Sequence, residues 1–187
     1  KGEGLGFLWP NGAGKTTTIR QLMGFIKPDS GSLSSRGMDC FKEADKIQQS
    51  LGYLPGEIAF IDSMNGMEFI KFVAKMKNMN GLGRAQELIQ MFELNASGKL
   101  KKMSKGMKQK IGIVCAFMDT NSDILILDEP TSGLDPLMQN RFVELVLSEK
   151  KQGKTILMSS HMFEEVERTC DRTAIIRAGK LVAVEEI

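Results

Sequence analysis

The sequence predicts an α/β fold in which a mostly parallel sheet is flanked by helices. Three observations support this prediction. Short apolar runs typical of buried strands alternate with amphipathic helical patterns, and this alternation favours parallel strands joined by right-handed crossovers. A Gly-rich segment separates the first apolar run from the first helical pattern. Between residues 58 and 110 the strand pattern stops, which indicates a helical insertion in the α/β core.

The composition is that of an ordinary globular chain. Its 187 residues fit one domain, or one core with a lobe inserted in it. The net charge of +2 is too small to indicate nucleic acid, so no nucleic-acid partner is expected. The cysteines are scattered and there is one histidine, which argues against a zinc site and favours a reducing cytosol. The longest apolar run, Ile111 to Met118, is too short to cross a bilayer as a helix.

The first part of the chain reads as strand, loop and helix. Leu5 to Leu8 form the expected strand, and apolar residues from Ile19 to Ile26 recur at helical spacing. Pro28 is expected to end that helix. The next elements predicted are a short strand at Ser32–Ser35, a weak helix at Glu43–Gln49 and a strand at Leu51–Leu54.

The inserted segment is expected to hold two amphipathic helices. Ser63 is the expected N-cap of the first, and the segment Asn80 to Gly83 ends it. Methionines on these helices are interpreted as core filler, with a soft binding surface as the alternative. A lysine cluster follows between Lys99 and Lys110. It is interpreted as a solvated face, and the alternative is attraction of a polyphosphate.

After residue 110 the α/β alternation resumes. Ile124 to Leu127 is a continuous apolar run, as expected for a strand buried on both faces. The other elements predicted are helices at Ile111–Met118, Leu137–Lys151 and Met162–Thr169, and strands at Thr155–Met158, Thr173–Ile176 and Leu181–Val184.

Two segments of the sequence are suited to phosphate chemistry. In the segment from Gly12 to Thr16, glycines let backbone N–H groups approach phosphate oxygens, and the following helix N-terminus favours an anion. Lys15 is placed to reach the β- and γ-phosphates, and Thr16 to ligate Mg²⁺. Asp128 and Glu129 directly follow a buried strand, at the edge where open α/β sheets bind ligands. One carboxylate there can hold Mg²⁺ and the next can activate a water.

These segments carry a family resemblance. The run ILILDEP at 124–130, followed by TSGLD at 131–135 and by His161 after a strand, resembles the ATP-binding subunit of an ABC transporter. Among such subunits the chain looks most like those of bacterial multidrug or antibiotic exporters. The resemblance implies a P-loop NTPase core at 1–57 and 111–187 and a helical subdomain at 58–110. It also implies ATP and Mg²⁺ as cofactors, a separate transmembrane permease subunit as partner, a homodimer or paired second ATPase subunit on ATP binding, and a location on the cytoplasmic face of the membrane.

The resemblance further implies a role for each site residue. Glu129, His161 and Lys15 are the implied catalytic residues, with Glu129 as the catalytic carboxylate and His161 as the switch histidine. Thr16 and Asp128 are the implied metal ligands. The implied nucleotide-binding residues are Asn11, Gly12, Ala13, Gly14, Lys15, Thr16 and Thr17 from Walker A, Ser104 and Gly106 from the segment that resembles L-S-G-G-Q, and Asp135 from the D-loop.

The sequence departs from the family pattern at several positions. Trp9 replaces the first Walker A glycine, and we expect weakened ATP binding from it. Gly56 stands where the family has a glutamine, and Glu57 is a candidate stand-in. Lys105 and Met107 depart from L-S-G-G-Q. The chain also starts almost on a strand, so an N-terminal truncation is expected.

Three functions are compatible with these residues. The first is an ATPase subunit that powers export through a separate membrane protein. The second is an ABC-type ATPase that has no transport role. The third is a nucleotide-binding module with impaired hydrolysis, and retention of the acidic, lysine and histidine positions argues against it.

Overall fold

The structure is a computed structural model that describes residues 2–8 and 12–187. The described residues form a six-stranded sheet in the order β4-β5-β6-β1-β7-β8. The pairs from β4 to β7 are parallel, and only β7 and β8 pair antiparallel. The sheet strands are β1 (Gly4–Leu8), β4 (Leu51–Leu54), β5 (Ile124–Asp128), β6 (Thr155–Ser160), β7 (Arg172–Arg177) and β8 (Lys180–Glu186). The predicted α/β fold with a mostly parallel sheet is therefore confirmed.

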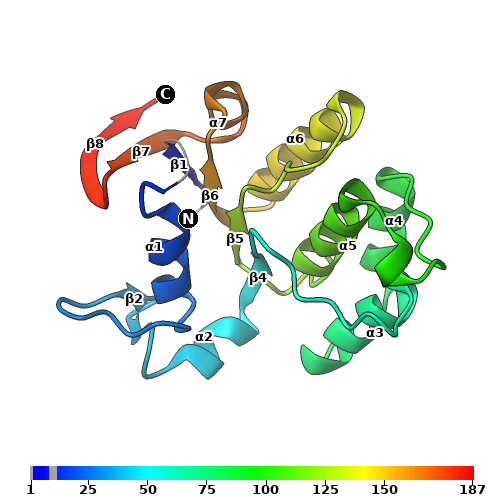
Figure 1. Cartoon of the computed structure of the whole chain (residues 1–187). Coiled ribbons are helices and arrows are strands. Elements are labelled where there is room, and N and C mark those ends of the chain that lie inside the picture. The colour runs from blue at the N-terminus through cyan, green and yellow to red at the C-terminus, as the bar shows by residue number, and fades with distance from the viewer. Residues whose placement is uncertain (1, 9–11) are drawn as a thin grey trace.

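Helices cover both faces of the sheet, as Figure 1 shows. On one side lie α1 and α2, and on the other lie α5 and α6, with α3 and α4 packed outside α5 (Figure 1). The helices are α1 (Lys15–Leu22), α2 (Ala44–Gln49), α3 (Gly66–Met76), α4 (Gly83–Met91), α5 (Lys105–Phe117), α6 (Pro136–Lys151) and α7 (Phe163–Thr169), with a 3₁₀ turn, η1, at Leu100–Lys102. None of the helices in the described ranges combines the length and apolar character needed to cross a bilayer.

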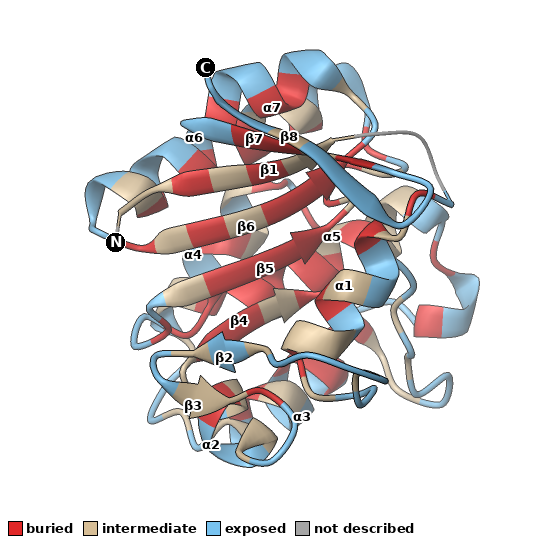
Figure 2. Cartoon of the chain, turned by 90° about the vertical axis from the view of Figure 1, so that its left-hand side faces the viewer, coloured by how far each residue is buried: buried red, intermediate tan, exposed pale blue. Residues whose placement is uncertain are grey.

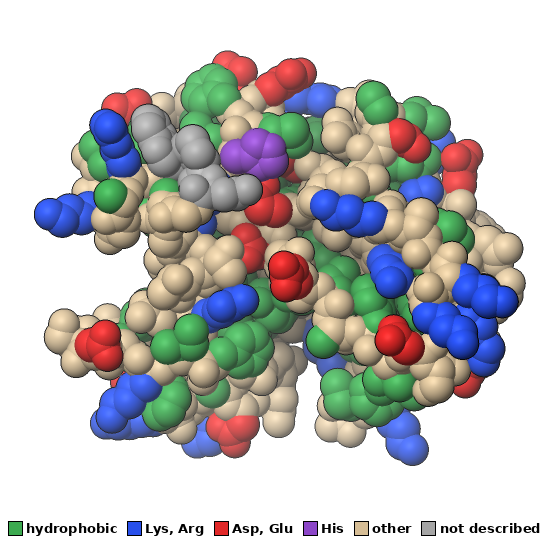
Figure 3. All heavy atoms as spheres, viewed as in Figure 1, with side chains coloured by type: hydrophobic (Ala, Val, Ile, Leu, Met, Phe, Trp, Pro, Cys, Tyr) green, Lys and Arg blue, Asp and Glu red, His purple; other side chains and the backbone are tan. Residues whose placement is uncertain are grey.

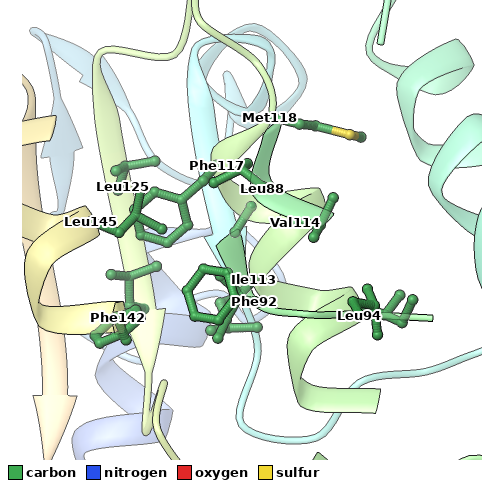
Figure 4. Packing of buried hydrophobic residues seen from close by; sticks show 14 of the residues in the cluster. Leu88, Phe92, Leu94, Ile113, Val114, Phe117, Met118, Leu125, Phe142 and Leu145 are labelled. Carbon is green, nitrogen blue, oxygen red and sulfur yellow. The ribbon is translucent and has the colours of Figure 1, made fainter. Parts of the chain in front are cut away.

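Strand β5 separates two hydrophobic clusters. Its side chains alternate, so Leu125 and Leu127 join the larger cluster with α5 and α6, whereas Ile126 joins a smaller cluster with α1 and α2. In the larger cluster Phe117 and Phe142 meet edge to face, with ring centroids 6.1 Å apart (Figure 4). Figure 2 shows that buried residues fill the central strands, while β8 at the sheet edge is mostly exposed. The central strands are thus held rigidly from both faces.

The first helix ends earlier than the sequence predicted. Met23 is its C-cap, and Gly24 follows in a left-handed conformation with φ of +77°. The Gly24 N–H donates to the Gln21 carbonyl and the Phe25 N–H to the Arg20 carbonyl, which is a Schellman motif. The prediction that Pro28 ends this helix was therefore wrong, and Ile26 is not on its buried face.

The inserted segment also differs from its prediction at one point. The N-cap of α3 is Asn65, not Ser63, and Asn65 forms a reciprocal capping box with Glu68. The short strand predicted at 32–35 is present as β2 (Ser34–Ser35), which pairs with β3 (Met38–Asp39) in a hairpin that was not predicted. Helix α5 runs across residue 110, and the division of the chain at that residue stays a prediction.

Candidate functional site

The Gly-rich loop lies between β1 and α1, at the carboxyl end of the parallel strands. Gly14 is the N-cap of α1 and has φ of +102°, a conformation that favours glycine. A Cβ added at Gly14 would also stand 3.3 Å from the Gly179 Cα in the turn between β7 and β8. The same turn donates the Gly179 N–H to the Ala13 carbonyl at 2.8 Å. Ala13 and Gly14 are therefore held in place by a distant part of the sequence.

Lys15 is the first residue of α1, and its side chain is held at the end of the sheet. It is 4% exposed, and its Nζ donates to the Ser160 carbonyl at 3.0 Å. The same Nζ lies 3.1 Å from Glu129 Oε1 and forms an ion pair with it. An ammonium group so deeply buried needs such partners, because desolvating an unpaired charge is costly.

Thr16 and Asp128 form the oxygen-rich part of the site. The Thr16 hydroxyl donates to Asp128 Oδ2 at 3.0 Å, and the Ser159 hydroxyl donates to Asp128 Oδ1. Asp128 is the last residue of β5 and is paired in register with Ser159 of β6. A hydroxyl and a carboxylate oxygen side by side are the hard donors that Mg²⁺ prefers. These two residues therefore fit the predicted magnesium ligands.

Glu129 leaves the strand in a strained conformation that aims its carboxylate at the loop. Its φ is +49°, which is uncommon for a residue other than glycine. The backbone is held there because the Glu129 N–H donates to the Ser159 hydroxyl at 3.0 Å and to the Ser159 carbonyl at 3.2 Å. Oε2 of Glu129 lies 2.9 Å from Nδ1 of His161. Glu129 thus stands between Lys15 and His161, with one carboxylate oxygen on each.

His161 follows β6 and lies at the surface. Its side chain is 55% exposed, and Figure 3 shows the histidine (purple) on a face where acidic side chains (red) gather. The predicted catalytic residues Lys15, Glu129 and His161 are therefore in contact, although they come from segments more than 30 residues apart.

Two adjoining hollows lie at these residues. The smaller one, about 180 Å³, is lined by Gly12, Gly14, Lys15, Thr16, Thr17 and Glu129. The larger one, about 560 Å³, shares Thr16 and Glu129 with it and is also lined by Asp128, Gly56 and Tyr53. Burial raises the pKa of the Tyr53 phenol, and the nearby Asp128 charge raises it further. The open space thus extends from the Gly-rich loop to the Asp128 carboxylate.

Gly56 stands at the edge of the larger hollow. A Cβ at this position would lie 3.1 Å from Asp128 Oδ2, which is closer than most such contacts. The glycine thus leaves the Asp128 carboxylate undisturbed. Glu57 lines the same hollow.

Ser104 and Gly106 do not join this cluster. Ser104 is the N-cap of α5, and its hydroxyl accepts from the Met107 N–H at 3.2 Å. A Cβ at Gly106 would lie 2.8 Å from the Gly133 carbonyl, so the start of α5 is packed against the segment after β5. Asp135 caps α6 by accepting from the Met138 N–H at 2.9 Å. Among the described residues, these contacts hold Ser104 and Asp135 on their own helices and Gly106 against the segment after β5.

Sequence reasoning missed the supporting contacts of the site. Ser159 holds both acidic residues, and Gly179 fastens the loop, yet the sequence analysis assigned neither of them a role in the site. Gln109, which was also missed, donates to the Pro130 carbonyl at 2.7 Å and joins α5 to the segment after β5. A serine two residues before the switch histidine was a visible signal for Ser159. Asn11 and Trp9, both singled out in the sequence, lie outside the described residues.

Comparison with known proteins agrees with this geometry. Residues 1–132 match the family described as "ABC transporter". The chain is 39% identical, over 189 aligned positions, to the linearmycin resistance ATP-binding protein LnrL of Bacillus subtilis; the alignment covers 98% of this chain and 60% of LnrL. This chain spans between about half and three fifths of the first curated relatives that it matches.

Solved structures share the fold. One described as the ATP-binding subunit of an ABC transporter has a TM-score of 0.89 and 31% identity, and the match covers all of this chain and 79% of that one. Another, a dimeric ATP-binding cassette in a post-hydrolysis state bound to ADP and Pi, has a TM-score of 0.88 and 22% identity, covering 99% of this chain and 85% of that one. At this identity the second structure supports the fold alone.

Proposed function

Because the chain belongs to the ABC transporter family, we propose that it binds and hydrolyses ATP to power export through a separate membrane subunit. The observation that carries this proposal is the contact of Lys15, Glu129 and His161 at one end of the sheet. A cation, a carboxylate and an imidazole beside a phosphate-binding loop are the groups that γ-phosphate hydrolysis needs.

The residues divide the chemistry among them. The N–H groups at the start of α1 bind phosphate oxygens, and Lys15 contributes a positive charge there. In the present arrangement Lys15 is paired with Glu129, so the phosphates of ATP compete with this carboxylate for the lysine. Once released, Glu129 accepts a proton from the attacking water, and His161 donates a hydrogen bond to the γ-phosphate.

Thr16 and Asp128 are the residues that would hold Mg²⁺. Their hydroxyl and carboxylate oxygens lie 3.0 Å apart, which shows that both reach the same small space. When bound, the ion neutralises charge on the β- and γ-phosphates. Ser159 keeps the Asp128 carboxylate in place from the opposite side.

A second copy, or a paired ATPase subunit, would complete the site. Ser104 and Gly106 lie at the start of α5, away from Lys15 of their own chain, and this N-terminus presents N–H groups suited to an anion. We infer that ATP is enclosed between the Walker A loop of one subunit and Ser104 of the other. Hydrolysis then removes the γ-phosphate contacts and favours the open state. A solved relative of the same fold is a dimer bound to ADP and Pi.

The membrane partner and the location follow from family membership. The relative LnrL is named for linearmycin resistance, which suggests export of an antibiotic-like compound here. We place the chain on the cytoplasmic face of the membrane, against a permease subunit. A non-transport ATPase of the same family is the alternative, and copurification with a polytopic membrane protein would distinguish the two.

The ATPase proposal is tested by phosphate release with Mg²⁺ and ATP. We expect Glu129→Gln to retain nucleotide binding and to lower kcat by about 10² to 10⁴, the range for loss of a general base. Glu167→Gln is the matched control, because Glu167 is an exposed acid on α7. Binding of ATP without turnover by the unsubstituted chain would favour a nucleotide-sensing module, and turnover unaffected by Glu129→Gln would contradict the assigned role.

A further inference from the structure

A third hollow, outside the proposed nucleotide site, leads to a buried carboxylate. It has a volume of about 410 Å³, lies between α6 and α7, and is lined by residues that include Thr131, Met162 and Glu165. Glu165 is only 6% exposed although it is on a surface helix. Acidic residues are seldom so buried without a specific partner.

The partner of Glu165 is the turn that carries the switch histidine. Oε2 of Glu165 accepts from the Ser160 hydroxyl at 2.8 Å. That hydroxyl in turn accepts from the Met162 N–H at 3.0 Å. Since His161 lies between Ser160 and Met162, the carboxylate and the hydroxyl together fix the backbone on both sides of the histidine.

Ser160 also reaches the phosphate loop. Its carbonyl accepts from Lys15 Nζ at 3.0 Å. Its neighbour Ser159 contacts Asp128 and Glu129 instead, as expected from the alternation of side chains along a strand. At the end of β6, the Ser159 side chain therefore holds Asp128 and Glu129, and the Ser160 side chain contacts Glu165.

The electrostatic surroundings connect Glu165 to the same groups. Burial raises the pKa of the Glu165 carboxyl, while the hydroxyls of Ser160 and Thr131 stabilise its charged form. The Glu129 charge raises that pKa further and His161 lowers it. Thr131 belongs to the segment that follows β5, so Glu165 faces both that segment and the switch turn.

We propose that Glu165 is a positioning residue that, through Ser160, sets the place of His161 and of the carbonyl that holds Lys15. This proposal rests on the ATPase function proposed above. It assigns Glu165 no contact with substrate, because its effect passes through the Ser160 hydroxyl. The residue belongs to none of the motifs that identify the family in this sequence.

The experiment compares Glu165→Ala, Glu165→Gln, Ser160→Ala and the double variant Glu165→Ala/Ser160→Ala. Glu167→Ala is the control, since it removes an exposed acid from the same helix. Two readouts are taken from each: kcat and KM for ATP, and the imidazole NMR signals in the absence of nucleotide. His161 is the single histidine of the chain, so these signals need no assignment.

We expect Glu165→Ala to lower kcat about tenfold while KM for ATP changes less than about threefold, because the reacting groups are present but misaligned. The His161 signals should move in Glu165→Ala and in Ser160→Ala but not in Glu167→Ala. Glu165→Gln should stay within about threefold of the unsubstituted chain, since its amide oxygen can accept from Ser160. The double variant should be no worse than the more impaired single variant.

Unchanged kcat and unmoved His161 signals in Glu165→Ala would overturn the proposal. Additive losses in the double variant would also overturn it, because Glu165 would then act by another route than Ser160. If circular dichroism shows that Glu165→Ala does not fold, Ser160→Ala removes the same hydrogen bond and decides the matter. The NMR readout needs no turnover, so failure of the ATPase proposal would be seen separately.

Discussion

Ser159→Ala is predicted to impair hydrolysis although Ser159 belongs to no catalytic motif. Its hydroxyl donates to Asp128 Oδ1 and accepts from the Glu129 N–H, and both Ser159 and Asp128 are almost completely buried. In Ser159→Ala the Glu129 N–H still donates to the Ser159 carbonyl at 3.2 Å. The main loss is therefore the hydrogen bond from the Ser159 hydroxyl to the Asp128 carboxylate. A hydrogen bond to a charged group contributes about 1.5–3 kcal/mol. If that bond is expressed in the transition state, kcat/KM falls by about 10-fold to 150-fold.

The assay is steady-state phosphate release, paired with thermal unfolding of each variant. Thr173→Val is the control, because the Thr173 hydroxyl is also buried in the sheet and has no hydrogen-bond partner among the described residues. That control should keep its activity, and its stability should not fall, because a buried unsatisfied hydroxyl is removed. Activity of Ser159→Ala within about twofold of the unsubstituted chain would refute the reasoning.

Three further predictions concern packing, the metal carboxylate and acid stability. Phe117→Ala should lower the free energy of unfolding by about 3–5 kcal/mol in urea titration, because the Phe117 ring is fully buried against Phe142. Phe163 is exposed, so Phe163→Ala should lower it only slightly. Equal losses in the two variants would contradict the packing argument. Gly56→Ala should weaken nucleotide binding measured with Mg²⁺ more than without it, since the added Cβ presses on Asp128, and equal effects would count against this. Desolvation raises the pKa of Asp171, but the Gly4 N–H and Lys150 outweigh it, so the folded pKa lies below 3.8. The contribution of Asp171 to the free energy of unfolding is therefore present above about pH 4 and is lost as pH falls through the folded pKa. Asp171→Asn should reduce the dependence of the free energy of unfolding on pH in this acid range.

Local sequence signals predicted the strands well and the helix ends less well. The run from Ile124 to Leu127 is apolar on both faces, which predicts a strand covered on both sides. The structure buries this strand on both faces, so the prediction was confirmed. Pro28 was a stronger visible stop than Gly24, yet the helix ends at Leu22, because the left-handed conformation of Gly24 lets backbone N–H groups satisfy the last carbonyls. Such a conformation depends on the packing around it. The cap at Asn65 was missed for a similar reason, because Ser63 is an equally good capping type.

The candidate site was predicted where chemistry and motif coincide. Lys15, Asp128 and Glu129 could be named because phosphate chemistry restricts which residue types fit, whereas His161 was named from the family resemblance. Glu165 could not be named in this way, because Glu164 and Glu167 lie near it in the sequence and are equally acidic. Only the fold decides which of these three residues is buried. Ser159 holds Asp128 and Glu129 from another strand, so nothing in the sequence around the two acids indicates this contact.

The arrangement of contacts also bears on how two subunits would act together. The start of α5 carries Ser104, and it is joined to the segment after β5 through Gln109 and the Pro130 carbonyl. That segment begins at Glu129, whose strained backbone is held by Ser159. A subunit that contacts the start of α5 would therefore act, through about one helical turn and one buried hydrogen bond, on the residue proposed to activate water. Since a packed interior transmits small shifts, binding of a second ATP-loaded subunit would adjust Glu129 in the first. On this view Gln109→Ala should leave ATP binding intact and weaken the increase of specific activity with protein concentration.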